Sequence, residues 1–99
     1  MEYGGCIYIM TNKHRTTLYI GVTSHLLNRI LEHKEHKYPS SFSAKYNLEY
    51  CIYYEFFSRI EEAIGREKEI KKWRREKKVA LIKTLNPEWV DLWEQLAGN

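Results

Sequence analysis

The sequence lacks the features that direct a chain into a membrane or an oxidising compartment. No uncharged apolar run approaches the roughly 20 residues that are needed to cross a bilayer. The first residues also lack a basic stretch followed by an apolar one, which is the pattern of a secretory signal. We therefore expect a cytoplasmic protein that does not enter a membrane.

Cysteine is scarce, since Cys6 and Cys51 are the only two in 99 residues. Two thiols without close spacing make a poor zinc site. Disulfide frameworks are typical of secreted chains, and secretion is not expected here. Both cysteines lie in apolar, strand-like segments, so we interpret them as reduced and buried thiols.

Internal repeats and low-complexity linkers are missing as well, so nothing in the sequence indicates a second unit. Apolar residues make up 43% of the 99 residues and aromatic residues 14%, which is typical of a folded globular chain. A chain of this length buries roughly 60–65% of the surface of its unfolded form without crosslinks. We expect residues 1–99 to form a single domain.

Apolar segments rich in β-branched and aromatic residues predict three strands, at residues 5–12, 16–23 and 48–57. The polar stretch between the first two predicts a hairpin. If its turn centres on Lys13 and His14, Tyr8 stands directly opposite Tyr19. The strands are apolar almost throughout, so helices are expected on both faces of the sheet.

Two helices are expected to cover these faces. Thr23 or Ser24 can cap the first, whose apolar stripe is Leu26, Leu27, Ile30 and Leu31. Ser58 can cap the second, with Glu61 completing a capping box, and this helix is expected to end near Trp73.

The remaining segments are a loop and a helical C-terminal part. Residues 35–46 predict a mobile loop, whose aromatic and basic side chains either contact a ligand or pack partly on the body. Residues 79–82 predict a short helix, and Asn86 followed by Pro87 predicts the start of a last helix. That helix presents an apolar face made of Trp89, Leu92, Trp93 and Leu96.

One carboxylate lies on an apolar helical stripe. The spacing of Ile60, Ala63, Ile64 and Ile70 places Glu67 on the same stripe. An ionised carboxylate buried alone costs several kcal/mol, so Glu67 needs a cation, a metal ion or strong donors. A neighbouring base such as Lys71 and a metal ion are both open at this point.

The net charge is only +3, yet residues 66–78 carry eight Lys or Arg against three Glu. Such a patch can contact the phosphates of a nucleic acid, and its candidate contacts are Lys71, Lys72, Arg74 and Arg75. The same run also fits a solvated helix face with Glu–Lys pairs one turn apart. Charge alone leaves both interpretations open.

Several residues form a recognisable set along the whole chain. The sequence has CIY at residues 6–8, YIG at residues 19–21, an arginine ten residues after the second tyrosine, and a histidine four residues later. With the later glutamate and asparagine, the set is Tyr8, Tyr19, Arg29, His33, Glu67 and Asn86. In this it resembles the GIY-YIG nuclease family, in particular its small single-domain bacterial branch and the GIY-YIG domain of the excision-repair incision subunit. Cys6 departs from the glycine that is usual in the first motif.

The resemblance implies an α+β fold, in which helices flank a three-stranded antiparallel sheet. It implies endonuclease-type hydrolysis of DNA phosphodiesters with one divalent cation, in DNA repair or processing. DNA would be the partner, with branched or single-stranded DNA among the candidate forms, and Mg²⁺ or Mn²⁺ would be the cofactor. The catalytic set would be the six residues named above, with Glu67 as the metal ligand.

The chemistry of these side chains agrees with that implication. A single carboxylate suits Mg²⁺ or Mn²⁺, which keep several waters and accept phosphate oxygens. The Arg29 guanidinium offers paired donors to a phosphate. Tyr8 or Tyr19 would activate the attacking water, but a free phenol has a pKa of about 10 and needs a neighbouring cation to act as a base. His33, which ordinarily titrates nearer neutrality, is the rival base.

Structural roles are the alternative for several members of the set. Tyrosines in a sheet are commonly packing residues, and helix capping alone accounts for Asn86. His14, His25 and His36 have no expected partner and are interpreted as surface residues. At the level of function, the alternatives to a nuclease are a nucleic-acid-binding module of the same fold with little or partner-dependent cleavage, and a protein-interaction domain.

Overall fold

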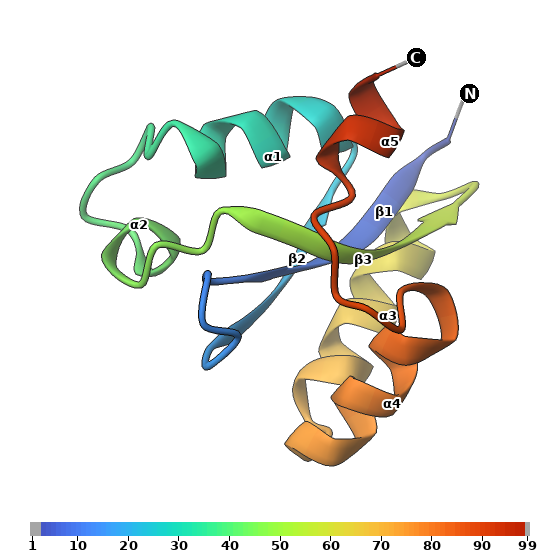
Figure 1. The fold of residues 1–99 in the computed structure, drawn as a ribbon. Helices are drawn as coiled ribbons and strands as arrows, with labels where there is room; N and C mark the ends of the chain where they lie inside the picture. Colours follow the sequence, from blue (N-terminus) through green and yellow to red (C-terminus); the bar gives the residue numbers. More distant parts are fainter. Residues whose placement is uncertain (1–2, 99) are drawn as a thin grey trace.

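The computed structural model describes residues 3–98, in which helices cover both faces of a three-stranded sheet (Figure 1). Its elements are β1 (Gly5–Thr11), β2 (Leu18–Thr23), α1 (Leu26–Lys34), α2 (Phe42–Lys45), β3 (Tyr50–Phe57), α3 (Ile60–Lys71), α4 (Arg75–Leu85) and α5 (Trp93–Ala97). The sheet is antiparallel throughout, with strand order β2-β1-β3. The predicted fold class and the three predicted strands are confirmed. In residues 3–98 no helix has the length and apolarity needed to cross a membrane.

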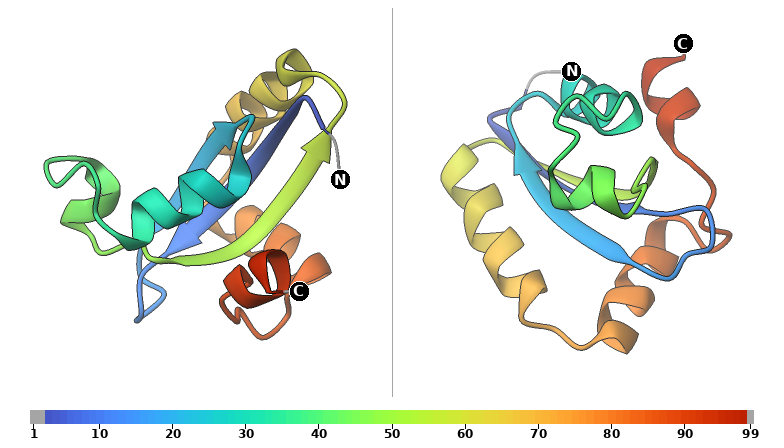
Figure 2. Two further views of the ribbon diagram at one scale, coloured as in Figure 1. Left: turned by 90° about the horizontal axis from the view of Figure 1, so that it is seen from above. Right: turned by 90° about the vertical axis from the view of Figure 1, so that its left-hand side faces the viewer.

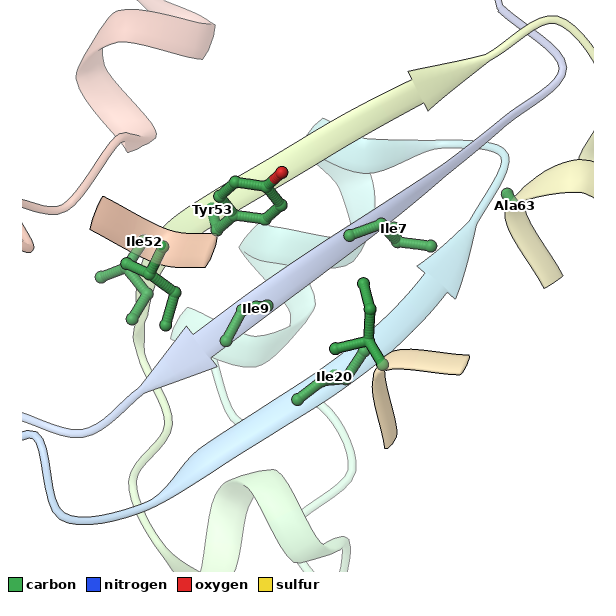
Figure 3. Packing of buried hydrophobic residues seen from close by; sticks show 8 residues of the cluster. Ile7, Ile9, Ile20, Ile52, Tyr53 and Ala63 are labelled. Atoms are coloured by element: carbon green, nitrogen blue, oxygen red, sulfur yellow. The ribbon is translucent and has the colours of Figure 1, made fainter. Parts of the chain in front are cut away.

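The sheet lies between α1 on one side and α3 and α4 on the other (Figure 2). It separates two buried clusters of side chains. The face that we call the back face is covered by α3 and α4 and buries Ile7, Ile9, Ile20, Ile52, Tyr53, Ala63, Ile70 and Ile82, several of which appear in Figure 3. The other, which we call the front face, is covered by α1 and buries Cys6, Tyr8, Met10, Leu26, Ile30, Leu48 and Cys51. Successive residues of β1 alternate between the two layers, as the pleat of a strand requires. Both cysteines are free and buried, as expected.

The register of the β1–β2 hairpin differs from the expected one. Tyr8 pairs with Gly21, and Tyr19 pairs with Met10. The prediction that Tyr8 stands directly opposite Tyr19 is therefore wrong. The two tyrosines still share the front face as diagonal neighbours, with ring centroids 6.2 Å apart.

Asn12 explains this shift in register. Its side-chain oxygen accepts hydrogen bonds from the backbone N–H groups of Thr16 at 2.8 Å and Thr17 at 3.2 Å. The backbone N–H of Arg15 donates to the Asn12 carbonyl at 3.0 Å, and Arg15 has a φ of 61°. The turn is therefore centred one residue later than expected, between His14 and Arg15, because an asparagine side chain competes with the strand ladder.

The start of α1 is fixed by contacts other than the predicted caps. His25 is the N-cap and makes no side-chain capping bond. The Thr23 hydroxyl accepts from the His25 N–H at 3.0 Å, and the Tyr3 hydroxyl accepts from the Leu26 N–H at 2.8 Å. Neither Thr23 nor Ser24 is the cap, because a tyrosine from the start of the chain satisfies the free donor instead.

The start of α3 lies one residue later than predicted. Its N-cap is Arg59 in place of Ser58, and the helix begins at Ile60. The side chain of Glu62, three residues after the cap, accepts from the Arg59 N–H at 3.2 Å, the role that was expected of Glu61. Half of a capping box is thus present, in a shifted frame.

The C-terminal part differs most from the prediction. Helix α4 is longer than residues 79–82, and Asn86 is its C-cap, whereas it was expected to start the next helix. Helix α5 begins only at Trp93. The side chains of Trp93 and Leu96 pack against the front-face core, so the expected folding back of this segment is observed.

Candidate active site

Tyr8 lies at the centre of the front face and is fully buried. Gly21 stands opposite it on β2, and a Cβ atom there would lie 2.4 Å from the Tyr8 hydroxyl oxygen. Real Cβ atoms do not approach so closely, so any side chain at position 21 would displace the phenol. The glycine of β2 therefore leaves the space in which the tyrosine of β1 is held.

The Tyr8 hydroxyl lies 3.0 Å from Nε2 of His33, and Nδ1 of His33 lies 2.7 Å from the Ser43 hydroxyl. The three side chains come from β1, α1 and α2 and form a continuous hydrogen-bonded chain. Arg29 is close enough to Tyr8 for its charge to favour a lower pKa of the phenol. One arrangement that satisfies both bonds has the Tyr8 O–H donating to Nε2 and the Nδ1–H donating to Ser43.

Arg29 is the cation of this cluster and lies one helical turn before His33, as expected. Its Nε lies 3.1 Å from the Glu32 carboxylate, which also forms an ion pair with Lys37 at 3.5 Å. The Arg29 side chain remains 44% exposed, so part of the guanidinium faces solvent beside the buried phenol. An incoming anion can therefore reach Arg29 without entering the core.

Burial decides the protonation states of the pair. It raises the pKa of Tyr8, with the neighbouring Tyr19 adding to the rise and Arg29 offsetting it only in part. Burial, assisted by the charge of Arg29, lowers the pKa of His33 from 6.5 to about 4. The expectation that His33 titrates near neutrality is therefore wrong. At neutral pH a neutral phenol donates to a neutral imidazole.

Tyr19 lies beside this pair, with its ring centroid 5.5 Å from that of His33. Its other neighbour is Phe42, 6.2 Å away and stacked at 30°. Phe42 belongs to α2, a helix within the segment that was expected to be a loop only. The structure therefore brings Tyr8, Tyr19, Arg29 and His33 together, on the face that α1 and α2 cover.

Glu67 lies on α3, which packs against β1 and β2, between the buried residues Ala63 and Ile70. Its side chain is 12% exposed and its carboxylate lies 2.5 Å from Lys71 Nζ. The expected burial is therefore found, together with the expected basic neighbour. Ile64 was predicted to lie on the buried stripe, but it is 37% exposed because α3 turns that position outward. Among the described residues, no hydrogen bond or ion pair joins Glu67 to the Tyr8 cluster.

The basic run of residues 66–78 is exposed, but two of its four candidate phosphate contacts already bind other residues of the fold. Lys71 pairs with Glu67, and Arg75 donates to the carbonyls of Arg15 at 2.8 Å and Thr16 at 3.2 Å in the β1–β2 turn. Lys72 and Arg74 are exposed between the two helices. Part of the run therefore attaches α4 to the β1–β2 hairpin.

Asn86 is 4% exposed, and its amide is used within the fold. Its nitrogen donates to the carbonyls of Ile52 at 3.0 Å and Val90 at 2.8 Å, and its oxygen accepts from the Val90 N–H at 3.1 Å. These bonds attach the segment after α4 to β3. A catalytic role for Asn86 stays a prediction, since none of these bonds leads to the Tyr8 cluster.

Three polar residues near the site were not expected from the sequence. Ser43 is hydrogen-bonded to Nδ1 of His33, Glu32 forms an ion pair with Arg29, and Ser41 caps α2 by accepting from the Ala44 N–H at 3.2 Å. Glu32 follows Arg29 by three residues, a helical spacing that favours such a pair. No comparable spacing links Ser43 to His33, because their contact depends on how α2 folds back. His36, expected at the surface without a partner, lies 2.6 Å from Glu49.

The comparison with protein-family models connects this geometry to a known class. Residues 4–80 match the GIY-YIG catalytic domain, which covers most of the chain. The chain belongs to the GIY-YIG family. The matched region contains the front-face cluster and Glu67, and it ends before Asn86. No curated protein and no solved structure matches the chain significantly.

Membership in the GIY-YIG family places the chain among the endonucleases. The substrate of such a nuclease domain is DNA, and GIY-YIG nucleases generally depend on divalent metal ions. In the GIY-YIG fold as seen here, β1 and β2 supply the two tyrosines and α1 supplies the arginine and the histidine. Helix α3, which packs against the same two strands, supplies the glutamate.

Proposed function

We propose that this protein is an endonuclease that hydrolyses DNA phosphodiester bonds with one divalent cation, in DNA repair or processing. The observation that carries the proposal is the buried Tyr8 hydroxyl, hydrogen-bonded to His33 and accompanied by the partly exposed Arg29. A phenol that only packed in the sheet would not require an imidazole and a guanidinium at its oxygen. In a family of nucleases, this arrangement supports proton transfer next to a phosphate.

Arg29 is assigned to the phosphate. Its planar guanidinium presents several donors, and phosphate oxygens accept them in pairs. Glu32 holds one edge of the group and leaves the remainder facing solvent. The same donors stabilise the negative charge that develops on the phosphate oxygens in the transition state.

Tyr8 and His33 are assigned to the attacking water. The water gives a proton to the Tyr8 oxygen while the Tyr8 proton passes to Nε2 of His33, so that neither a free phenolate nor a free hydroxide accumulates. In the free protein the low pKa of His33 opposes this transfer. A phosphate at Arg29 brings negative charge, which favours the imidazolium. Substrate binding thus prepares the acceptor, and Tyr19 positions the water from the side.

Glu67 is assigned to the metal ion, and its surroundings fit that role. Its nearly buried carboxylate has one basic partner, Lys71, whose own side chain is 51% exposed and free to turn away. In residues 3–98 no three His, Cys, Asp or Glu side chains gather into a site, so water and phosphate oxygens would complete the coordination, as Mg²⁺ prefers. When bound, Mg²⁺ or Mn²⁺ neutralises charge on the phosphate and acidifies water.

The short ion pair between Glu67 and Lys71 favours a second candidate function. If that pair is the whole purpose of Glu67, the protein is a DNA-binding module of the same fold, with little cleavage or with cleavage that requires a partner. Such a module would still use Arg29 and the exposed Lys72 and Arg74 for phosphates.

The experiment incubates the purified protein with supercoiled, single-stranded and branched DNA, with Mg²⁺, with Mn²⁺ and with a chelator. We expect cleavage that requires the metal ion and is lost in Glu67→Gln, because the variant removes the ligand charge. Glu61→Gln is the matched control, since Glu61 is an exposed acid on the same helix. Cleavage at the wild-type rate by Glu67→Gln would show that Glu67 is only structural. Binding without cleavage under every condition would favour the second candidate.

A further inference from the structure

The most exposed aromatic side chains of the described part of the chain all belong to the segment from the end of α1 to the end of α2. They are Tyr38, Phe42 and Tyr46, with 57%, 50% and 42% of their surface exposed. Phe42 is the first residue of the short helix α2 and Tyr46 is its C-cap, and their ring centroids are 4.7 Å apart. Two large rings that face solvent together are unusual unless something covers them.

A row of rings connects these residues to the buried hydroxyl. Tyr8 neighbours Tyr19 at 6.2 Å, Tyr19 stacks with Phe42 at 6.2 Å, and Phe42 contacts Tyr46. The row begins at Tyr8, whose hydroxyl is assigned to accept a proton from the attacking water, and it ends at the surface with Tyr46. A nucleotide that follows the reacting phosphate along this row meets the faces of Phe42 and Tyr46.

Packing within α2 does not account for the exposure of Phe42. The next two residues, Ser43 and Ala44, are buried at 8% and 9% exposure. Ser43 is held by the hydrogen bond to His33, and Ser41 caps the helix. The helix is therefore anchored through its small residues, and the anchor presents the large ring to solvent in a defined position.

The charges around the rings match a polyanion. Lys45 Nζ lies 5.8 Å from the centre of the Tyr46 ring, and Lys37 Nζ lies 5.7 Å from that of Tyr38. Helix α2 has no acidic residue in its first turn. Cations beside exposed aromatic faces are the combination that binds single-stranded nucleic acid, in which bases stack on rings while phosphates contact the cations.

We propose that Phe42 and Tyr46 form a stacking platform for an unpaired nucleobase next to the phosphate that Arg29 and Tyr8 hold. In duplex DNA both faces of each base are covered by neighbouring bases, so only an unpaired or extruded base can use the platform. The preferred substrates are therefore single strands, flaps and junctions with unpaired nucleotides at the cleavage site. This inference rests on the proposed function and names the substrate class of the same site.

The test measures binding of a fluorescent oligothymidylate and of a duplex, with chelator present so that no hydrolysis occurs. Leucine keeps apolar volume but removes the aromatic face. Phe42→Leu and Tyr46→Leu should each bind the single strand about 5- to 100-fold more weakly and the duplex nearly as before. Leu85→Ala, which truncates an exposed apolar residue at the end of α4, is the control and should change neither affinity.

A second arm removes one base at a time from the oligonucleotide. At the position that stacks, an abasic site should weaken wild-type binding by a similar factor and have little effect on Phe42→Leu. Full single-strand affinity in Phe42→Leu, or equal abasic losses in wild type and variant at every position, would overturn the platform. So would a dimer of the protein that the Phe42 substitution dissociates, because a second copy would then cover the rings.

The outcomes for the platform and for the proposed function are separable. Coupling between Phe42 and one base in a protein that never cleaves would support the platform and refute the nuclease. Cleavage of duplex and single-stranded DNA at equal rates, unaffected by Phe42→Leu, would support the nuclease and refute the platform.

Discussion

The two faces of the sheet share the same strands but differ in the kind of side chain that they bury. The back face is mainly aliphatic, with Ile7, Ile9, Ile20, Ile52, Ile70 and Ile82 in one cluster. The front face buries a tyrosine hydroxyl, two thiols and a thioether, and it continues into the polar chain through His33 and Ser43. The back face also contains one tyrosine, Tyr53, whose hydroxyl donates to Glu55. The faces therefore differ in that one is mainly aliphatic, while the other carries the hydrogen-bonded chain of Tyr8, His33 and Ser43.

This difference indicates how the fold supports a site with unfavourable elements. A buried phenol and an uncharged imidazole need a rigid setting, because an unpaired polar group in the core is costly. Strand β1 supplies that setting, since the residues on either side of Tyr8 are Ile7 and Ile9 on the back face. The back face therefore holds the strand in place, and the front face is free to carry reactive groups.

The largest expected effect is on the cleavage rate, in variants of front-face residues. Tyr8→Phe removes one hydroxyl and keeps the ring, so single-turnover cleavage should fall roughly 10²- to 10⁴-fold with DNA affinity preserved. Tyr19→Phe should cost less because Tyr19 acts from the side. His33→Ala should cost less because water can accept the Tyr8 proton in place of the imidazole. Wild-type rates for both Phe variants, together with an inactive His33→Ala, would show that the attacking water gives its proton directly to His33 and that neither tyrosine relays it.

The next largest effect is on the stability of the back face. Ile70→Ala empties a fully buried site in the aliphatic cluster and should lower the free energy of unfolding by about 2–5 kcal/mol. The cleavage rate per folded molecule should stay near the wild-type value at low temperature. Denaturant titration and single-turnover assays on the same preparation measure both. A lost rate at full folding would show that packing of the aliphatic cluster is coupled to the chemistry.

A smaller effect is expected for pH. Because the folded pKa of His33 is about 4 and its ordinary value is 6.5, the unfolded chain binds a proton first as pH falls. Stability should therefore be lost between about pH 6.5 and pH 4 and be fully present above that window. His33→Gln should remove about 1–2 kcal/mol of this dependence, a figure reduced because the ring is partly exposed. Identical pH profiles for variant and wild type would contradict the shift.

The smallest effect concerns the basic run outside both cores. Replacing Lys71, Lys72, Arg74 and Arg75 by glutamine should flatten the salt dependence of DNA binding by about one slope unit per lost phosphate contact. We expect less than the full four units, because Arg75 is bound to the β1–β2 turn. An unchanged slope would assign the run to a solvated helix face.

Much of the fold followed from the sequence because local signals and tertiary structure agree. The strands were found from apolar, β-branched segments, and the pairing of Arg29 with His33 on one side of α1 followed from helical spacing. The predicted register of the β1–β2 hairpin was wrong because the Asn12 side chain replaces a backbone partner in the turn. The predicted N-cap of α3, Ser58, lies one residue before the observed N-cap, Arg59. The prediction missed because Glu61 and Glu62 are adjacent, and either can complete a capping box three residues after its cap.

The part of the site that the sequence did not predict depends on long-range contacts. The burial that sets the pKa of His33 comes from β1, α1 and α2 together, and spacing along the chain cannot give it. Ser43 was missed because its segment has no apolar period, although it folds into α2. Asn86 was taken for a helix start because Pro87 follows it, while the side chain in fact attaches the chain to β3.

The division between the two faces is tested most directly at two adjacent residues of β1, Ile7 and Tyr8, which point to opposite layers. The measurement determines the single-turnover cleavage rate and the unfolding free energy for Ile7→Ala and Tyr8→Phe under the same conditions. We predict a crossover, in which Ile7→Ala loses stability and retains its rate per folded molecule, while Tyr8→Phe loses its rate and at most about 1 kcal/mol of stability. Parallel losses of both quantities in both variants would contradict the account.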